Sequence, residues 1–371
     1  MKRAVVVQQY VPGYRVAFYQ HLARELASRD IELTVAHGRP WGKDVRRADA
    51  CALAGTVQLP QCTLSLAGRH LVWRSLGRVT RDCDALILGQ SLHSLENYRA
   101  LLGAGGPPVG LWGHGTTYTR TPSAPLRAAK RALTLRARWF FAYTEKGARQ
   151  VIGDGFPEQR VTVVRNTVDT RALEAAGARV APSELAALRA EFGLTPGRSA
   201  LYIGGLDAAK RIPFLLAAAA RTGELLPGFR LLVAGDGAHR HLVEEAAQAG
   251  APVAYVGTAS DERKARLGAV TDVLLVPGAV GLAAVDSFAL HSPLVTTPDA
   301  AHGPEFEYLQ HGRNALVVDG DADAYGAAVA QLLTRPVLLG NLRSACRVDA
   351  QLFTVEDMAR RFADGVEGLI G

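Results

Sequence analysis

The sequence VLLVPGAVGLAAVDSFALHSPLVTT, residues 273–297, decides the fold of this chain. Its first four residues are an unbroken apolar run of the kind that forms a buried strand, and Pro277-Gly278 ends the run with a turn. The spacing of apolar residues then predicts a helix from near Gly281 to Ser292, and residues 294–297 predict a second strand. Strand, turn, helix and strand form a βαβ unit, the building block of a parallel sheet covered by helices.

The turn before this predicted helix is a candidate anion site. The first backbone N–H groups of a helix have no partner inside the helix and can bind a phosphate. Asp286 lies five residues into the helix, where its carboxylate could accept hydrogen bonds from the paired hydroxyls of a ribose. The alternative is a helix that packs on the sheet with Asp286 in solvent.

Length and composition indicate a globular protein of two domains. The chain has 371 residues, more than the roughly 250–300 that one core holds, and 48% of them are hydrophobic. Its four cysteines are scattered, which predicts reduced thiols and no zinc site. The apolar run at residues 4–7 is too short for a signal peptide, and no run reaches the roughly 18–20 residues that span a bilayer. We expect a cytoplasmic protein, either free or bound peripherally at the inner face of the membrane.

Charge divides the chain into a basic half and an acidic half. Residues 1–180 hold 26 Lys and Arg against 13 Asp and Glu, whereas residues 181–371 hold 16 against 22. A basic domain attracts an acidic acceptor or an anionic membrane surface, although arginine that merely covers the surface is the alternative. No recognised nucleic-acid module or row of stacking aromatics accompanies the charge, so we expect no binding to nucleic acid.

The first half begins as a doubly wound domain. Residues 4–10 predict a strand, residues 11–15 a turn and residues 17–29 a helix. Ligands of such domains bind at the carboxyl ends of the strands, so Gly13 and Arg15 are candidate substrate-binding residues, with a surface arginine as the alternative for Arg15. The turn lacks Gly-x-Gly-x-x-Gly, which argues against a dinucleotide site. The further predicted strands are residues 31–36, 85–88, 109–112, 139–143 and 161–164.

His114 directly follows one of these strands and lies between two glycines. Such a histidine can approach a ligand closely, or it is a structural residue of the loop. The basic segment 127–138 predicts a helix, either solvated or lying against anionic lipid. The Asp-x-Asp sequences at 82–84 and 319–321 are explained by turns, so we expect no metal site.

The second half restarts the alternation of strands and helices. Strand 200–203 leads into a glycine-rich loop, residues 204–211, whose Lys210 and Arg211 suit a diphosphate. Strands 230–234 and 253–256 end at further glycines, Gly235 and Gly257. We expect an N-terminal domain at 1–175, a C-terminal domain at 176–345, and C-terminal helices at 346–371 that pack back on the N-terminal domain.

Several segments in this order resemble the retaining glycosyltransferases of family 4, which have the GT-B fold. The family's Gly-Arg-Leu-x-x-x-Lys-Gly loop is similar to residues 204–211, and its Val-x-x-Asn-Gly-Val-Asp segment is similar to residues 163–169. Its Gly-Asp-Gly turn matches residues 235–237, its Glu-Gly-Phe-Gly-x-x-x-x-Glu-Ala segment aligns with residues 278–287, and its later Glu…Gly-x-Asn-Gly segment resembles residues 305–315. The resemblance covers nearly the whole chain. It implies two Rossmann-like doubly wound domains that face across a cleft, with the nucleotide sugar on the C-terminal one.

The resemblance also implies roles for individual residues. His114 would orient the donor sugar, and Lys210 and Arg211 would stabilise the departing diphosphate. The substrate-binding residues would be Gly13, Arg15, Asn166, Gly204, Gly205, Gly235, Gly257, Gly278, Val280, Gly281, Leu282 and Asp286. No metal or other cofactor is implied, because the leaving phosphate oxygen can accept the proton of the acceptor hydroxyl.

Two positions depart from the family pattern. Gly278 stands where the family usually has a glutamate that binds the donor sugar, and Gly205 replaces the arginine of Gly-Arg-Leu. Arg211 is the expected substitute for that arginine, and the backbone amides of Val280, Gly281 and Leu282 are the expected substitutes for the glutamate.

The function that the resemblance implies is transfer of a sugar, with retained configuration, from a nucleotide-diphosphate donor such as a UDP-sugar to a hydroxyl of a glycan, lipid-linked or natural-product acceptor. The departures at Gly205 and Gly278 leave a catalytically weak GT-B protein that acts as a binding partner as one alternative. A GT-B nucleotide-sugar epimerase or a phosphorylase is another.

Overall fold

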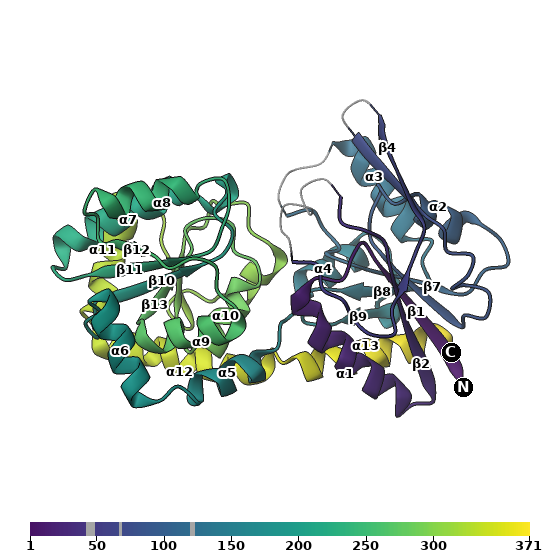
Figure 1. The fold of residues 1–371 in the computed structure, drawn as a ribbon. Coiled ribbons are helices and arrows are strands. Elements are labelled where there is room, and N and C mark those ends of the chain that lie inside the picture. The colour runs from purple at the N-terminus through teal and green to yellow at the C-terminus, as the bar shows by residue number, and fades with distance from the viewer. Residues whose placement is uncertain (42–48, 67–68, 119–122) are drawn as a thin grey trace. The chain divides into compact units, whose positions relative to one another are not determined.

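The computed structural model describes residues 1–41, 49–66, 69–118 and 123–371. The chain forms two compact units, which are Met1–Val168 together with Val355–Gly371, and Asp169–Thr354 (Figure 1). Each unit contains a parallel sheet with apolar clusters on both of its faces. The predicted α/β class with two Rossmann-like domains is therefore confirmed.

The first unit is built on a parallel sheet with the strand order β3-β2-β1-β6-β7-β8-β9. Alternate residues of β1 supply the two faces, since Ala4 and Val6 belong to one apolar cluster and Val5 and Val7 to the other. The strands are β1 (Lys2–Gln8), β2 (Ile31–His37), β3 (Val57–Gln58), β6 (Ala85–Gly89), β7 (Val109–Gly113), β8 (Trp139–Ala142) and β9 (Val161–Val163). The helices are α1 (Val16–Ala27), α2 (Leu95–Leu102), α3 (Ala124–Thr134), α4 (Glu145–Gly153) and α13 (Val355–Ile370).

An antiparallel hairpin, β4 (Gln61–Leu66) with β5 (Arg69–Arg74), is the main element of this unit that the sequence did not predict. Residues 62–65 of β4 are exposed, so the strand lacks the buried apolar run that identifies the strands of the main sheet.

The second unit repeats the plan with the strand order β12-β11-β10-β13-β14-β15. Its strands are β10 (Ser199–Ile203), β11 (Arg230–Ala234), β12 (Val253–Tyr255), β13 (Val273–Leu275), β14 (Leu294–Thr296) and β15 (Ala315–Val317). Its helices are α5 (Thr170–Ala178), α6 (Pro182–Phe192), α7 (Ile212–Leu225), α8 (Arg240–Gln248), α9 (Asp261–Val270), α10 (Ala283–Ala289), α11 (Ala322–Leu333) and α12 (Pro336–Leu352). The stretch 273–297 forms β13, α10 and β14, as predicted, although the helix begins two residues after Gly281.

The strand order reverses once in each sheet, between β1 and β6 in the first unit and between β10 and β13 in the second. At such a point the connections leave the sheet in opposite directions, and the carboxyl ends of the two strands open into a crevice where ligands bind. The fold therefore marks one position in each unit at which to look for a site.

The predicted domain boundaries fall inside two helices of the second unit and need correction. Leu173 of α5 packs with Ala265 and Ala289, and Leu342 of α12 belongs to the large apolar cluster of the second unit. The structure consequently places the boundaries after Val168 and Thr354 instead of after 175 and 345.

Helix α13 returns to the first unit, where it lies beside α1 (Figure 1). Phe362 stacks on Phe141 of β8 with ring centroids 4.4 Å apart. Gly365 and Gly368 face the Phe141 and Trp139 rings so closely that a Cβ atom would lie within 2.5 Å of them. These contacts make α13, and not the whole segment 346–371, a part of the first unit.

Candidate active site

The loops after β10 and β11 pack against each other at the crevice of the second unit. Leu206 N–H donates to Asp236 O at 2.8 Å, and Gly235 N–H donates to Gly257 O at 2.8 Å. A Cβ on Gly235 would lie 1.8 Å from Gly204 O, so only glycine fits there. The predicted substrate-binding residues Gly204, Gly205, Gly235 and Gly257 are thus brought to one edge of the sheet.

The loop after β13 is joined to the loop after β10 through Gly278. A Cβ on Gly278 would lie 2.4 Å from the carbonyl carbon of Lys210 and 2.5 Å from Ala209 O. Ala279 N–H donates to Ala209 O at 2.8 Å, and Lys210 Nζ donates to Ala279 O. Gly278 is therefore covered by the neighbouring loop on the side where a side chain would point, and its role in substrate binding stays a prediction. This contact also explains why no glutamate stands at this position.

The amide of Val280, predicted to bind the donor, is used by the protein instead. Val280 N–H donates to Nδ1 of His302 at 3.2 Å, and Nε2 of His302 donates to Thr297 O at 2.8 Å. Burial lowers the pKa of His302, so the ring is neutral at pH 7 with its proton on Nε2. In the described part of the chain, the amides of Gly281 and Leu282 have no hydrogen-bond acceptor and stay available for a ligand.

Arg211 has an acidic partner in the structure. Its Nη1 donates to Asp299 Oδ1 at 3.0 Å and to Thr297 Oγ1 at 3.1 Å, and its guanidinium lies 4.3 Å from the ring centroid of Phe214. The side chain is 30% exposed. Asp299 therefore balances part of the charge of Arg211, and the replacement of the arginine missing at position 205 by Arg211 stays a prediction.

Asp286 is buried on α10 and has one oxygen without a partner. Its Oδ2 lies 3.5 Å from Lys264 Nζ, whereas its Oδ1 has no hydrogen-bond donor among the described residues. Burial raises the pKa of Asp286, and Lys264 holds back part of that rise. Since a buried polar atom without a partner is costly, Oδ1 marks a position that a ligand hydroxyl can fill. The alternative of a solvated Asp286 is wrong.

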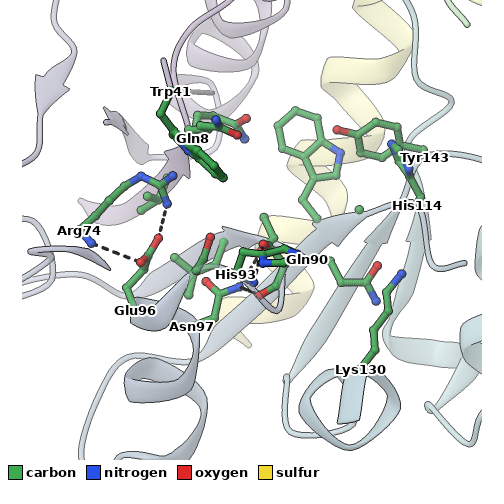
Figure 2. Close-up of a pocket in the computed structure, with 18 of the residues that line it drawn as sticks. Gln8, Trp41, Arg74, Gln90, His93, Glu96, Asn97, His114, Lys130 and Tyr143 are labelled. Atoms are coloured by element: carbon green, nitrogen blue, oxygen red, sulfur yellow. Dashed lines mark hydrogen bonds and ion pairs between the residues drawn. The ribbon is translucent and has the colours of Figure 1, made fainter. Parts of the chain in front are cut away.

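A pocket of about 260 Å³ lies at the crevice of the first unit, where β1, β6 and β7 end (Figure 2). Figure 2 shows Arg74 and Glu96 on one side of it and His114, Tyr143 and Lys130 on the other. Its other polar or aromatic lining residues are Gln8, Gln9, Trp41, Gln90, Ser91, His93, Ser94, Asn97, Trp112 and Thr116.

His114 lines this pocket as a neutral side chain. Its ring centroid lies 4.6 Å from that of Tyr143. Burial lowers the pKa of His114 to about 4, and the positive charges of Lys130 and Arg15 add to the effect. At neutral pH the ring can donate and accept hydrogen bonds but carries no charge.

The lowered pKa of His114 makes folding depend on pH. Between pH 7 and pH 5 the unfolded chain binds a proton at the ordinary histidine pKa of about 6.5, whereas the folded protein does not. The free energy of unfolding should therefore fall as the pH is lowered. In His114→Gln the fall between pH 7 and pH 5, measured by urea unfolding, should be smaller by about 2 kcal/mol. Equal falls in both proteins would contradict the neutral, buried histidine.

Arg15 and Asn166 lie in the interior and not in the pocket. Arg15 is 3% exposed, and its Nη2 donates to Oδ1 of Asn166, which is 2% exposed. The Arg15 guanidinium also lies 4.9 Å from the ring centroid of Trp112. Gly13 packs on a neighbouring loop through its N–H bond to Asp49 O at 2.8 Å. The alternative of a surface arginine is wrong, whereas substrate binding by Arg15 and Asn166 stays a prediction.

The remaining sequence motifs have structural roles. Asp84 accepts a hydrogen bond from Arg3 N–H, and Asp321 caps the first turn of α11. No group of three His, Cys, Asp or Glu in the described residues could hold a metal ion. No described helix is long and apolar enough to cross a membrane. Four arginines of the segment 127–138 are exposed, and their contact with anionic lipid stays a prediction.

Family models match both halves of the chain. The model described as Glycosyltransferase Family 4 matches residues 17–172, and the model described as Glycosyl transferases group 1 matches residues 197–335. The protein EpsD of Bacillus subtilis (strain 168), named as a candidate glycosyltransferase, is 30% identical over 190 residues. That match spans 48% of this chain and about half, 49%, of EpsD.

Solved structures share the fold over the whole chain. HepE from Anabaena, in complex with UDP, has a TM-score of 0.68 at 16% identity and covers 99% of this chain and 100% of its own. A glycosyltransferase from Rickettsia africae has a TM-score of 0.71 at 12% identity, with 99% and 98% covered. With both halves matched by the family models and the fold shared from end to end, this chain belongs to family 4 of the GT-B glycosyltransferases.

Proposed function

We propose that the protein transfers a sugar from a UDP-sugar to an acceptor hydroxyl with retained configuration, and that it does so without a metal ion. The observation that carries the proposal is the buried carboxylate of Asp286, whose Oδ1 has no donor among the described residues at the crevice of the second unit. A ribose offers the hydroxyl that this oxygen lacks. The complex of HepE with UDP supports uracil as the base.

Negative charge grows on the diphosphate as it leaves, so the reaction requires positive potential at that position. Lys210 and the amides of Gly281 and Leu282 supply it, since they lie on the two loops joined at Gly278. In the proposed reaction the bond between the anomeric carbon and the phosphate oxygen breaks, and a bond to the acceptor oxygen forms on the same face. The acceptor proton moves to the leaving phosphate oxygen, and UDP departs. His114, neutral in the pocket of the first unit, acts as a hydrogen-bonding group toward a sugar.

A second function, binding without transfer, is favoured by one observation. The backbone of Lys210 fills the space beside Gly278, so no side chain takes the place of the family's glutamate. A GT-B protein that binds the nucleotide but does not hold the donor sugar in place would act as a binding partner.

Calorimetry with UDP, GDP, ADP and dTDP tests the proposal, followed by transfer assays with the sugar nucleotides of the base that binds. We expect UDP to bind with the highest affinity and a UDP-sugar to be consumed only when an acceptor is present. Binding of UDP with no turnover of any UDP-sugar would favour the second function. Absence of binding to every nucleotide would contradict both.

A further inference from the structure

The buried polar atoms without a partner along the pocket of the first unit are all hydrogen-bond donors. They are Nε1 of Trp112, Nε1 of Trp41 and Nε of Arg74, which have no acceptor in the described parts of the chain. Trp112 is 3% exposed and Arg74 is 5% exposed. Because a buried donor without an acceptor costs free energy, this pocket suits a ligand that supplies acceptor atoms.

Two acceptor groups of the pocket, the carboxylate of Glu96 and Oε1 of Gln90, are already engaged. Glu96 is the single carboxylate among the described lining residues, and it accepts hydrogen bonds from Nη1 and the backbone N–H of Arg74. Oε1 of Gln90 accepts from Gly115 N–H at 3.2 Å. The single carboxylate among the described lining residues is thus already paired with Arg74 and does not balance a cationic ligand.

Positive charge gathers at the end of the pocket near His114. Lys130 points from α3 toward the side where His114 and Tyr143 lie (Figure 2). Among the described residues its Nζ donates one bond, to Thr116 O at 3.1 Å, which leaves two of its three protons for a ligand. Burial lowers the pKa of Lys130, because the attraction of the nearby Asp154 is weaker than the loss of hydration of the ammonium group. An anion bound at this end of the pocket would compensate for that lost hydration.

The walls between these polar groups are aromatic. The rings of Trp112 and Tyr143 lie with centroids 5.7 Å apart, and both line the pocket together with Trp41. Flat apolar surfaces combined with a few directed polar groups are what a site for a sugar ring requires, since the ring has apolar faces and polar edges.

We propose that this pocket binds an acceptor sugar that carries an acid group, a carboxylate or a phosphate, with the acid group beside Lys130. The inference rests on the proposed function and names the class of acceptor. The basic charge of residues 1–180 led us to expect an acidic acceptor. The inference places the acid group of that acceptor beside one residue, Lys130.

Titrations of the full chain saturated with UDP, followed by saturation-transfer NMR, test the inference with three probes. Methyl β-D-glucuronide and methyl β-D-glucoside differ at one carbon, a carboxylate against a hydroxymethyl group, and glucose 6-phosphate places a phosphate there. We expect at least one of the acidic probes to bind roughly tenfold more tightly than the glucoside, which is the low end of what a charge-assisted hydrogen bond contributes. Comparison of the two acidic probes tells which acid group the pocket takes.

Variants of two residues on one helix make the test specific. Lys130→Gln should reduce the preference to less than about twofold, and Lys130→Arg, which keeps the charge, should retain most of it. Arg127→Gln removes the same charge from an exposed position of α3 and should leave the preference unchanged. Thermal unfolding of each variant shows whether it folds.

The inference would be overturned by equal affinities of the three probes for the unaltered protein, by a preference that survives Lys130→Gln, or by an equal loss in Arg127→Gln. A weaker affinity of Lys130→Gln for UDP itself would also overturn it, because Lys130 would then serve the donor. Failure of the unaltered protein to bind UDP would contradict the proposed function instead, so the two failures are distinguishable.

Discussion

Replacing Asp286 by Asn should weaken UDP binding about 100-fold. Oδ1 of Asp286, which has no donor in the described part of the chain, is the atom that we assign to the ribose, and the carboxylate can accept from both ribose hydroxyls. Two charge-assisted hydrogen bonds of about 1.5 kcal/mol each amount to about 3 kcal/mol, or two orders of magnitude in affinity. Asparagine keeps the size of the side chain, so the measured change in the dissociation constant by calorimetry reports the lost charge.

Asp261 provides a matched control for this change. Its Oδ1 lies 3.1 Å from the same Lys264 Nζ, but its side chain is 79% exposed. Asp261→Asn removes the same charge next to the same lysine and should change UDP affinity by less than about threefold, since exposed ion pairs contribute little. If both variants bind UDP equally well, Asp286 does not touch the nucleotide.

Adding a single methyl group at Gly278 should abolish transfer. In Gly278→Ala the new Cβ would lie within 2.5 Å of the backbone of Ala209 and Lys210, which cannot move as a flexible side chain does. The two loops would be pushed apart and the bond from Lys210 Nζ to Ala279 O lost. We expect a fall in activity of at least 100-fold and a loss of about 2–3 kcal/mol in the free energy of unfolding.

Gly205→Ala is the control for stability. Among the described residues, a Cβ on Gly205 would meet only Oδ2 of Asp207, at 3.3 Å, which a small rotation of that side chain relieves. Thermal unfolding should therefore distinguish the two alanines, with a melting temperature lower by about 5–10 °C in Gly278→Ala alone. Similar melting temperatures would show that the loop can retreat and that Gly278 does not fix the position of Lys210.

The sequence predicts the sheets better than it predicts what each site residue contacts. Strands buried on both faces are continuous apolar runs, which is why 273–276 and 200–203 could be assigned without structural information. Burial of a polar residue depends on partners far along the chain. Asn166 lies 151 residues after Arg15, and Lys264 lies 22 residues before Asp286, so no local sequence pattern predicts either contact.

The resemblance to the family indicates which loops to examine, but it does not show which of their atoms the protein itself already contacts. Gly278 and Val280 occupy the expected turn, yet one is covered by the loop after β10 and the amide of the other is bound to His302. His302 has no place in the motifs and could not have been found from them. The pocket of the first unit depends likewise on Arg74 of a hairpin that the sequence did not predict.

Because α13 packs on the first unit, the second unit can be completed before the first during synthesis. Residues 169–354 form the second unit as one uninterrupted segment, which can fold as soon as it has left the ribosome. The first unit is made earlier, but the faces of Phe141 and Trp139 that receive α13 stay uncovered until residues 355–370 emerge. The first unit is therefore translated before the second but completed after it, because its core lacks α13 until residues 355–370 have been made.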